Sequence, residues 1–231
     1  MDEGKVIPDQ LVRQVVDAVK IVTRQLVDGY RRRIYVNEDH LTGALVSMLE
    51  ERLKGLSIRG IRIVPRALSR KEEMVTGADL GVLMNIYTPN FRLSKALIAQ
   101  AKRCECSKGY YLSRGSLGKV VEQCRKMLKI TSSAFVLVYT NNFDCGILVF
   151  PAGDIIALNR ASCTALSMLY TIRLDRLFEI FMKCHVGDPM IAEVYWNFSG
   201  LKDFMAEYGI RHGLLLMLIS EERLQRTSLF R

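Results

Sequence analysis

Residues 77–104 read GADLGVLMNIYTPNFRLSKALIAQAKRC, and this stretch decides the fold. Ala78–Tyr87 is almost wholly apolar, which predicts a strand that is largely buried. Leu97–Lys102 predicts the neighbouring strand, and Pro89 with Asn90 supplies the chemistry of a turn between them. The stretch therefore predicts a hairpin with its loop near Pro89.

The residues before this hairpin predict two helices and one strand. Apolar residues spaced three or four apart predict a helix over 9–30, and a second helix over 37–53 begins at an asparagine that can cap it. Residues 58–64 alternate weakly between apolar and polar, which predicts a strand that Pro65 ends. We expect a polar loop over 69–76.

The residues after the hairpin add helices and strands in alternating blocks. An amphipathic helix is predicted over 116–129, strands over 135–139 and 146–150, and helices near 174–184 and 201–207, with an apolar run at 214–219. The order of helices, strands, helix, strands and helices predicts a mixed α/β fold. We expect a single domain with a helical segment 1–34, a core over about 35–150 and further α/β elements over 151–231.

The composition excludes several classes of protein. The chain has 231 residues, of which 49% are hydrophobic, so it can bury enough apolar surface to offset the entropy of ordering. Six cysteines spread over this length indicate reduced thiols rather than a disulfide scaffold. No apolar run approaches the ~18 residues of a membrane span, and Asp2 and Glu3 are unlike a basic signal region. We expect a soluble, cytoplasmic protein with no membrane partner.

The net charge of +9 is unevenly distributed. Residues 1–130 carry 24 Lys and Arg against 14 Asp and Glu, whereas residues 131–231 carry nine against ten. A localised positive field favours a polyanion such as nucleic acid, whose phosphates give affinity that is independent of sequence. A solvated face that only keeps the protein in solution would give the same charge balance.

The hairpin places polar residues where chemistry is possible. Gln100 and Lys102 are two apart in a strand, so their side chains project from the same face, which Ile98 shares further back. Asp79 stands at the start of the preceding strand, 21 positions before Gln100, and a hairpin with its loop at Pro89 can close that separation. We therefore expect these side chains to meet.

An acidic residue from the second predicted helix is a candidate for the same site. Leu41 and Leu45 follow Glu38 at i+3 and i+7, so its carboxylate is expected on the core-facing stripe. Asp39 shares a side with Thr42 instead, which makes it the weaker candidate. Carboxylate and carbonyl oxygens suit Mg²⁺, which takes few protein ligands and can activate water near a phosphodiester.

These residues resemble the restriction-endonuclease-like PD-(D/E)xK nuclease superfamily, in the variant with glutamine in place of the second acid. The motifs are Gly77-Ala78-Asp79-Leu80, then Gln100-Ala101-Lys102-Arg103, with Asn37-Glu38-Asp39 upstream. The resemblance spans roughly residues 35–150 and is greatest to nuclease domains of bacterial anti-phage defence proteins. It implies a restriction-endonuclease-like mixed β-sheet core flanked by helices.

The resemblance also implies roles for individual residues. Asp79, Gln100 and the backbone carbonyl of Ala101 would bind the metal, Glu38 would complete the site, and Lys102 would assist the attacking water. The implied activity is hydrolysis of phosphodiester bonds with Mg²⁺, for which Mn²⁺ also fits, and DNA is the favoured substrate. The implied role is that of an endonuclease effector in prokaryotic defence.

Such nucleases often act beside a sensor or an ATPase. Gly115-x-x-Gly118-Lys119 lacks both the spacing of a phosphate loop and the Ser or Thr that follows its lysine, so we find no ATPase signature. We expect a sensor, an ATPase or another regulatory partner, or assembly into a homo-oligomer, to control the activity.

The sequence departs from the superfamily pattern in two ways. No proline directly precedes Asp79, and Gln100 removes one negative charge, which weakens metal binding unless Glu38 compensates. A second hypothesis is therefore a non-catalytic nucleic-acid-binding or scaffold subunit. Taken singly, a lysine near a strand end, an aspartate in a turn and a glutamate in a first helical turn are each common structural residues.

The cysteine and histidine motifs give weaker indications of function. Cys104-x-Cys106 would begin a zinc site, but Cys124 is the next cysteine and no nearby pair of histidines completes four ligands, which favours reduced structural thiols. The three histidines, His40, His185 and His212, pair with no Cys or Ser motif at a recognisable spacing.

Overall fold

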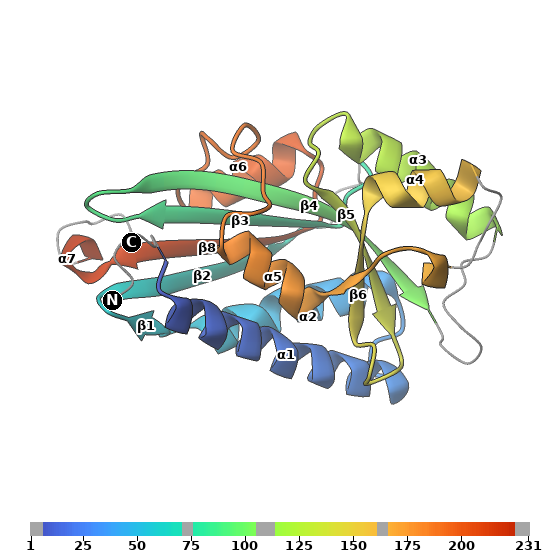
Figure 1. Cartoon of the computed structure of the whole chain (residues 1–231), viewed down its shortest axis with the longest axis horizontal. Coiled ribbons are helices and arrows are strands. Elements are labelled where there is room, and N and C mark those ends of the chain that lie inside the picture. Colours follow the sequence, from blue (N-terminus) through green and yellow to red (C-terminus); the bar gives the residue numbers. More distant parts are fainter. Residues whose placement is uncertain (1–6, 71–75, 105–113, 161–165, 225–231) are drawn as a thin grey trace.

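A mixed sheet of eight strands forms the middle layer of the molecule, and helices cover both of its faces (Figure 1). The structure is a computed structural model that describes residues 7–70, 76–104, 114–160 and 166–224. The strand order across the sheet is β1-β2-β8-β3-β4-β5-β6-β7. The expected α/β class, with a mixed sheet flanked by helices, is confirmed.

The predicted blocks are found in the predicted order, together with a helix over 152–160 and short strands at 57–58 and 172–173 that were not expected. The helices are α1 (Asp9–Arg31), α2 (Glu38–Leu53), α3 (Arg114–Leu128), α4 (Ala152–Arg160), the short 3₁₀ helix η1 (Leu166–Met168), α5 (Leu174–Met182), α6 (Phe198–Glu207) and α7 (Glu221–Leu224). The strands are β1 (Ser57–Ile58), β2 (Ile61–Ser69), β3 (Leu80–Tyr87), β4 (Arg92–Cys104), β5 (Ala134–Thr140), β6 (Ile147–Pro151), β7 (Ile172–Arg173) and β8 (His212–Ser220). Most of the expected loop over 69–76 lies outside the described residues.

The predicted hairpin is present and lies inside the sheet. β3 and β4 pair antiparallel, with Leu80 opposite Ala99, and Thr88 N donates to the Phe91 carbonyl at 2.9 Å to close the turn. β4 then pairs parallel with β5, and the connection between them contains α3. The polar start of β3 and the polar end of β4 are therefore side by side.

The sheet separates two apolar layers, which we name by a helix that covers each. The α1 face is covered by α1, α2 and α5, and the α3 face by α3, α4 and α6 (Figure 1). Alternation along β4 sends Leu97 and Ala99 to the α1 face and Ala96 and Ile98 to the α3 face. The same alternation assigns Gln100 to the α3 face.

The second helix, α2, begins and ends where the sequence predicts. The side chain of Asn37 accepts a hydrogen bond from His40 N at 2.8 Å and so caps α2, which satisfies one of the free N–H groups of its first turn. Gly55, just beyond α2, has a φ of +83°, a conformation that glycine adopts without strain. Within the described part of the chain, no helix is long and apolar enough to cross a membrane.

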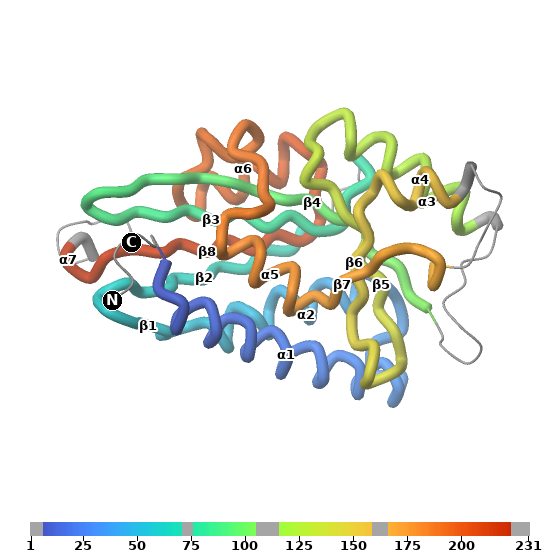
Figure 2. The backbone as a smooth tube through the Cα atoms, in the orientation of Figure 1, coloured from blue at the N-terminus to red at the C-terminus, as the bar shows by residue number. Residues whose placement is uncertain are grey.

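The apolar run at 214–219 forms β8, a strand in the middle of the sheet. The predicted order of elements contains no strand at this point of the chain. β8 pairs antiparallel with β2 and parallel with β3, and all nine of its residues are buried. Figure 2 shows this strand, in red, lying beside β2 near the start of the chain. A continuous apolar run fits a buried strand or a buried helix equally well, so only the pairing decides.

Pro65 does not end the second strand, contrary to expectation. β2 continues to Ser69 because the N–H groups on this side of the strand face away from β8. Ile63 N, two residues earlier, donates at 2.9 Å to the carbonyl of Leu56 on that outer side. Pro65 lies two residues further along and faces the same outer side, so its missing N–H group costs β2 no hydrogen bond to β8. Proline is tolerated in an edge position of a sheet for this reason.

Candidate active site

Asp79 and Gln100 face one another across the start of β3 and the end of β4. Asp79 directly precedes β3, and its N–H donates at 2.9 Å to the carbonyl of Ala99, the residue of β4 that pairs with Leu80. The Gln100 side-chain nitrogen donates to Asp79 Oδ2. The expected meeting of these side chains is therefore found, and the hairpin register produces it.

The backbone of Ala101 joins the same cluster. Ala101 N donates to Asp79 Oδ2 at 2.9 Å, and Gln100 Nε2 donates to the carbonyl oxygen of Ala101 at 3.0 Å. The Gln100 amide nitrogen thus bridges a carboxylate oxygen and a carbonyl oxygen. We name Asp79, Gln100, Ala101 and Lys102 the hairpin cluster.

The Gln100 amide is incompletely satisfied. Its side chain is 1% exposed, and its Oε1 atom is buried with no hydrogen-bond partner. An unpaired buried acceptor costs ~1–3 kcal/mol, so such atoms are uncommon unless a ligand uses them. The Ala101 carbonyl, the Asp79 carboxylate and the Gln100 amide oxygen are all hard oxygen donors, and this set fits Mg²⁺.

Burial dominates the electrostatics of Asp79. The side chain is 8% exposed, and burial raises its pKa above the ordinary range of an aspartate. The hydrogen bond from Ala101 N and the charges of Lys102, Arg211 and His212 oppose this effect but do not cancel it. A cation beside Asp79 would favour its ionised form, because opposite charge stabilises a carboxylate.

Lys102 lies on the same side of β4 as Gln100 and is half-buried. Its charge acts on Asp79 and also on the Cys124 thiol of α3, whose pKa burial raises to about 12. Cys124 is completely buried, which supports the expectation that it is an inert structural thiol. Lys102 is therefore a half-buried cation next to the hairpin cluster's only carboxylate.

Glu38 does not have the inward orientation that its spacing predicts. Its carboxylate is 36% exposed and forms an ion pair with Arg103, with 3.6 Å between Glu38 Oε1 and Arg103 Nε. Arg103 follows Lys102 and so points to the α1 face, and it also donates to the Val36 carbonyl at 2.6 Å. Glu38 is in the first turn of α2, at the end of the buried stripe, where the helix leaves the core. Among the described residues, no hydrogen bond or ion pair joins Glu38 to the hairpin cluster.

Asp39, expected to be the weaker candidate, lies in a polar cluster that the sequence did not reveal. Asp39 Oδ1 is 2.9 Å from Arg211 Nη1 and 2.9 Å from His212 Nε2. Ser69 Oγ is 2.8 Å from the other ring nitrogen of His212. We name these four residues the helix cluster, because Asp39 of α2 is at its centre.

The helix cluster is closely fitted. A Cβ atom on Gly43 would lie 3.2 Å from the His212 ring, so glycine here lets α2 approach β8. Burial acts to raise the pKa of Asp39, but the hydrogen bonds from Arg211 and His212 outweigh it, and the pKa is lowered. The adjacent Arg211-His212 pair before an apolar run was the only signal in the sequence, and nothing in it indicates a partner on α2.

The metal-ligating residues within reach of one another are few. In the part of the chain that the structure describes, no group of three or more His, Cys, Asp or Glu side chains could hold a metal ion. A cation at the hairpin cluster would therefore depend on one carboxylate and on neutral oxygens. Of the Cys104-x-Cys106 pair, Cys104 is buried, and Cys106 lies outside the described residues.

Comparison with known proteins gives no match: no family model, no curated protein and no solved structure resembles the chain significantly. The chemistry of the site therefore has to be argued from its own residues. The two features that carry the argument are the convergence of oxygen donors at the hairpin cluster and the half-buried lysine beside it.

Proposed function

We propose that this protein is a metal-dependent nuclease that hydrolyses phosphodiester bonds, with DNA as the favoured substrate. One observation carries the proposal: Asp79 Oδ2 and the Ala101 carbonyl oxygen both lie within hydrogen-bond reach of the Gln100 amide, with Lys102 on the same side of the strand. The resemblance to the glutamine variant of the PD-(D/E)xK superfamily assigns these same four positions.

Asp79, the Ala101 carbonyl and the Gln100 amide oxygen would hold Mg²⁺. A bound Mg²⁺ supplies Lewis-acid chemistry that neutralises phosphodiester charge and activates water. The side-chain amide of Gln100 can rotate by 180°, which exchanges the positions of its oxygen and nitrogen atoms. The oxygen would then lie where the nitrogen now bridges Asp79 Oδ2 and the Ala101 carbonyl oxygen. The Oε1 atom has no hydrogen-bond partner in its present position, whereas in the rotated amide it would be a metal ligand, at the expense of the two hydrogen bonds that Nε2 now donates.

The remaining residues would bind the substrate and orient the reacting groups. Lys102 would donate hydrogen bonds to a phosphate oxygen or to the attacking water and so hold the reacting atoms in place. The positive charges of Lys102 and Arg211 already act on Asp79, so the region carries a field that attracts an anion. The excess charge of residues 1–130 extends this argument to a long phosphate backbone.

The biological setting follows from the resemblance alone. We propose a cytoplasmic effector of prokaryotic anti-phage defence, controlled by a sensor, an ATPase or another partner, or by assembly into a homo-oligomer. Glu38 remains a proposed ligand only if its ion pair with Arg103 opens, so it is tested separately from Asp79.

The alternative is a non-catalytic nucleic-acid-binding or scaffold subunit. One observation favours it: the Gln100 amide nitrogen already satisfies Asp79 and Ala101 without any cation. In that case the protein would bind DNA with a steep dependence on salt but would bind no metal at Asp79.

Cleavage of plasmid DNA by the purified protein in Mg²⁺, with its partner where one is known, tests the proposal. We expect Asp79→Ala and Lys102→Ala to abolish cleavage, while Lys126→Ala, which removes an exposed lysine of α3, leaves it unchanged. Calorimetric titration with Mn²⁺ separates the two hypotheses, because only a nuclease should lose binding on Asp79→Ala. Cleavage by Asp79→Ala at the parent rate would show that the site assignment is wrong.

A further inference from the structure

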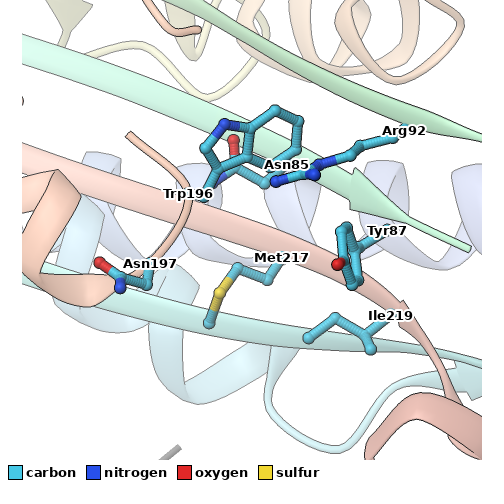
Figure 3. Close-up of a pocket in the computed structure, with 7 residues that line it drawn as sticks. All are labelled: Asn85, Tyr87, Arg92, Trp196, Asn197, Met217 and Ile219. Carbon is cyan, nitrogen blue, oxygen red and sulfur yellow. The ribbon is translucent and has the colours of Figure 1, made fainter. Parts of the chain in front are cut away.

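A second candidate site lies on the α3 face, at the opposite end of β3 from Asp79. It is a pocket of about 290 Å³ over β3 and β8, beside the segment that leads into α6 (Figure 3). Its lining includes Asn85 and Tyr87 of β3, Met217 and Ile219 of β8, Arg92 of β4, and Trp196. Asn85 is six residues beyond Asp79, which at ~3.3 Å per residue separates the two sites by about 20 Å.

Arg92 is a positioned cation in this pocket. Its guanidinium carbon is 4.1 Å from the ring centre of Trp196 and 4.9 Å from that of Tyr87, so two aromatic rings hold it. No carboxylate among the described residues forms an ion pair with it. Its planar set of N–H donors therefore suits an anion from outside the chain, and phosphate and carboxylate groups match that geometry.

Asn85 supplies hydrogen bonds at the buried side of the pocket. It is 2% exposed, its Nδ2 donates to the Tyr195 carbonyl at 2.8 Å, and its Oδ1 accepts from Ser94 Oγ at 2.6 Å. These two bonds fix the amide and leave it one further N–H and one further lone pair. An adjacent donor and acceptor is the pattern with which asparagine recognises the edge of a nucleobase, adenine above all.

Apart from Asn197 at its side, the rest of the lining is apolar or aromatic and matches a flat ring. Met217 and Ile219 project from β8 toward the pocket, and Trp196 lies above them (Figure 3). The volume is at the lower limit of small-molecule pockets, which suits one ring system with a charged substituent. The pocket therefore combines an apolar floor, a fixed amide and a fixed cation.

We propose that this pocket binds a nucleotide, with its base against Trp196 and the floor of β8 and its phosphate on Arg92. The nucleotide is either a free small molecule or one unit of a nucleic-acid strand, and both present the same base and phosphate. The proposal does not depend on the hairpin cluster, because none of its residues lines this pocket.

Trp196 is the only tryptophan of the chain, so intrinsic fluorescence reports on this pocket directly. The experiment titrates the purified full chain with AMP in the presence of EDTA, so that the outcome is independent of any metal. We expect saturable quenching by AMP, with adenosine and inorganic phosphate each binding at least about tenfold more weakly, because each provides only half of the contacts. Equal binding of phosphate and AMP would overturn the role of the base.

Variants separate the pocket from the rest of the molecule. Arg92→Gln should weaken AMP about tenfold by removing the charge-assisted hydrogen bonds. Arg24→Gln removes an exposed arginine of α1, on the other side of the sheet, and should leave the affinity unchanged. Asp79→Ala should also bind AMP normally, whatever its effect on cleavage. If Arg92→Gln and Arg24→Gln bind AMP equally, the proposal fails.

A short single-stranded oligodeoxyadenylate, titrated in the same way in EDTA, distinguishes the two sources of the nucleotide. Binding at least about tenfold tighter than that of AMP, and weakened by Arg92→Gln, would identify a strand as the ligand. Binding no tighter than that of AMP would identify a free nucleotide. The absence of quenching by both ligands at millimolar concentration would overturn the proposal.

Discussion

Two polar clusters lie at the same end of the sheet, and they differ in what their carboxylates contact; each also holds one buried atom without a hydrogen-bond partner, Gln100 Oε1 in the hairpin cluster on the α3 face and Arg211 Nε in the helix cluster. On the α1 face, the helix cluster ties the Asp39 carboxylate to Arg211 and His212, and His212 to Ser69. The Asp39 carboxylate is held by two cationic or polar side chains, whereas Asp79 is held by neutral amide groups, and on this difference we base the proposal that Asp79 serves as a ligand and Asp39 has a structural role.

The two aspartates show the same contrast in their electrostatics. Burial raises the pKa of Asp79 in spite of the positive charges around it. For Asp39, hydrogen bonds from Arg211 and His212 outweigh burial and lower the pKa. A carboxylate whose charge its neighbours do not fully compensate suits cation binding, and one that is already paired suits a structural role.

The largest expected effect is on the rate of DNA cleavage. It is tested by substituting Asp79 and Asp39 in turn. Asp79→Asn should reduce plasmid cleavage in Mg²⁺ by ~1,000-fold, because the only carboxylate of the hairpin cluster is lost. Asp39→Asn should keep cleavage within about threefold, because it alters a structural pair. Equal loss of cleavage in the two variants would place the acids of α2 in the active site and end the contrast between the faces. Circular dichroism of both variants checks that they are folded.

The next effect is on stability. His212→Ala removes a side chain that is 5% exposed and leaves Asp39 and Ser69 without their shared partner. We expect the free energy of unfolding in urea to fall by about 2–3 kcal/mol. His40→Ala is the matched control, since this exposed histidine of α2 should change stability by less than ~0.5 kcal/mol. A loss below ~0.5 kcal/mol for His212→Ala would contradict a structural helix cluster.

A smaller effect tests whether Gln100 of the hairpin cluster is a metal ligand. Gln100→Glu adds a second carboxylate where the amide now bridges Asp79 and Ala101. Carboxylate ligands strengthen the binding of hard cations, so the Mn²⁺ affinity measured by calorimetry should rise about tenfold. In EDTA the same variant should lose stability, because the two carboxylates then repel one another. An unchanged affinity would mean that Gln100 is not a ligand.

The smallest effect is on an exposed ion-pair network of α5. Hydrogen bonds from Lys183 and Arg176 lower the pKa of Glu179 to about 2. The folded pKa lies below the unfolded one, so the stability from this pair is present above about pH 4.5 and is lost as the pH falls toward 2. Glu179→Gln should therefore shift the urea midpoint slightly at pH 6 and not at pH 2, with solvent screening keeping the change small. A large shift at pH 6 would mean that exposed pairs contribute as much as the helix cluster.

Part of the candidate site could be predicted from the sequence because it depends on local order. Gln100 and Lys102 share a face because strands alternate, and Asp79 meets Gln100 because a short turn sets the register of β3 and β4. Glu38 could not be oriented in this way. The helical period gives its angle around α2 but does not say where the helix leaves the core.

The helix cluster and the second pocket depend on β8, which reaches the middle of the sheet from the end of the chain. His212 meets Asp39 across 173 positions, and Met217 and Ile219 meet Trp196 only once β8 is paired with β3. No periodicity within β8 encodes that pairing, because every one of its residues is buried and its run of apolar residues carries no alternation.

The sequence by itself determined the mixed α/β class, the hairpin of β3 and β4, and the convergence of Asp79, Gln100 and Lys102, since each of these follows from periodicity and a short connection. Only the tertiary structure decided that β8 separates β2 from β3, that Asp39 rather than Glu38 pairs with the start of β8, and that Arg92 and Trp196 meet over a pocket. The physical reason is distance along the chain: long-range pairings are set by the burial of whole faces against one another, and no short stretch of sequence records its partner.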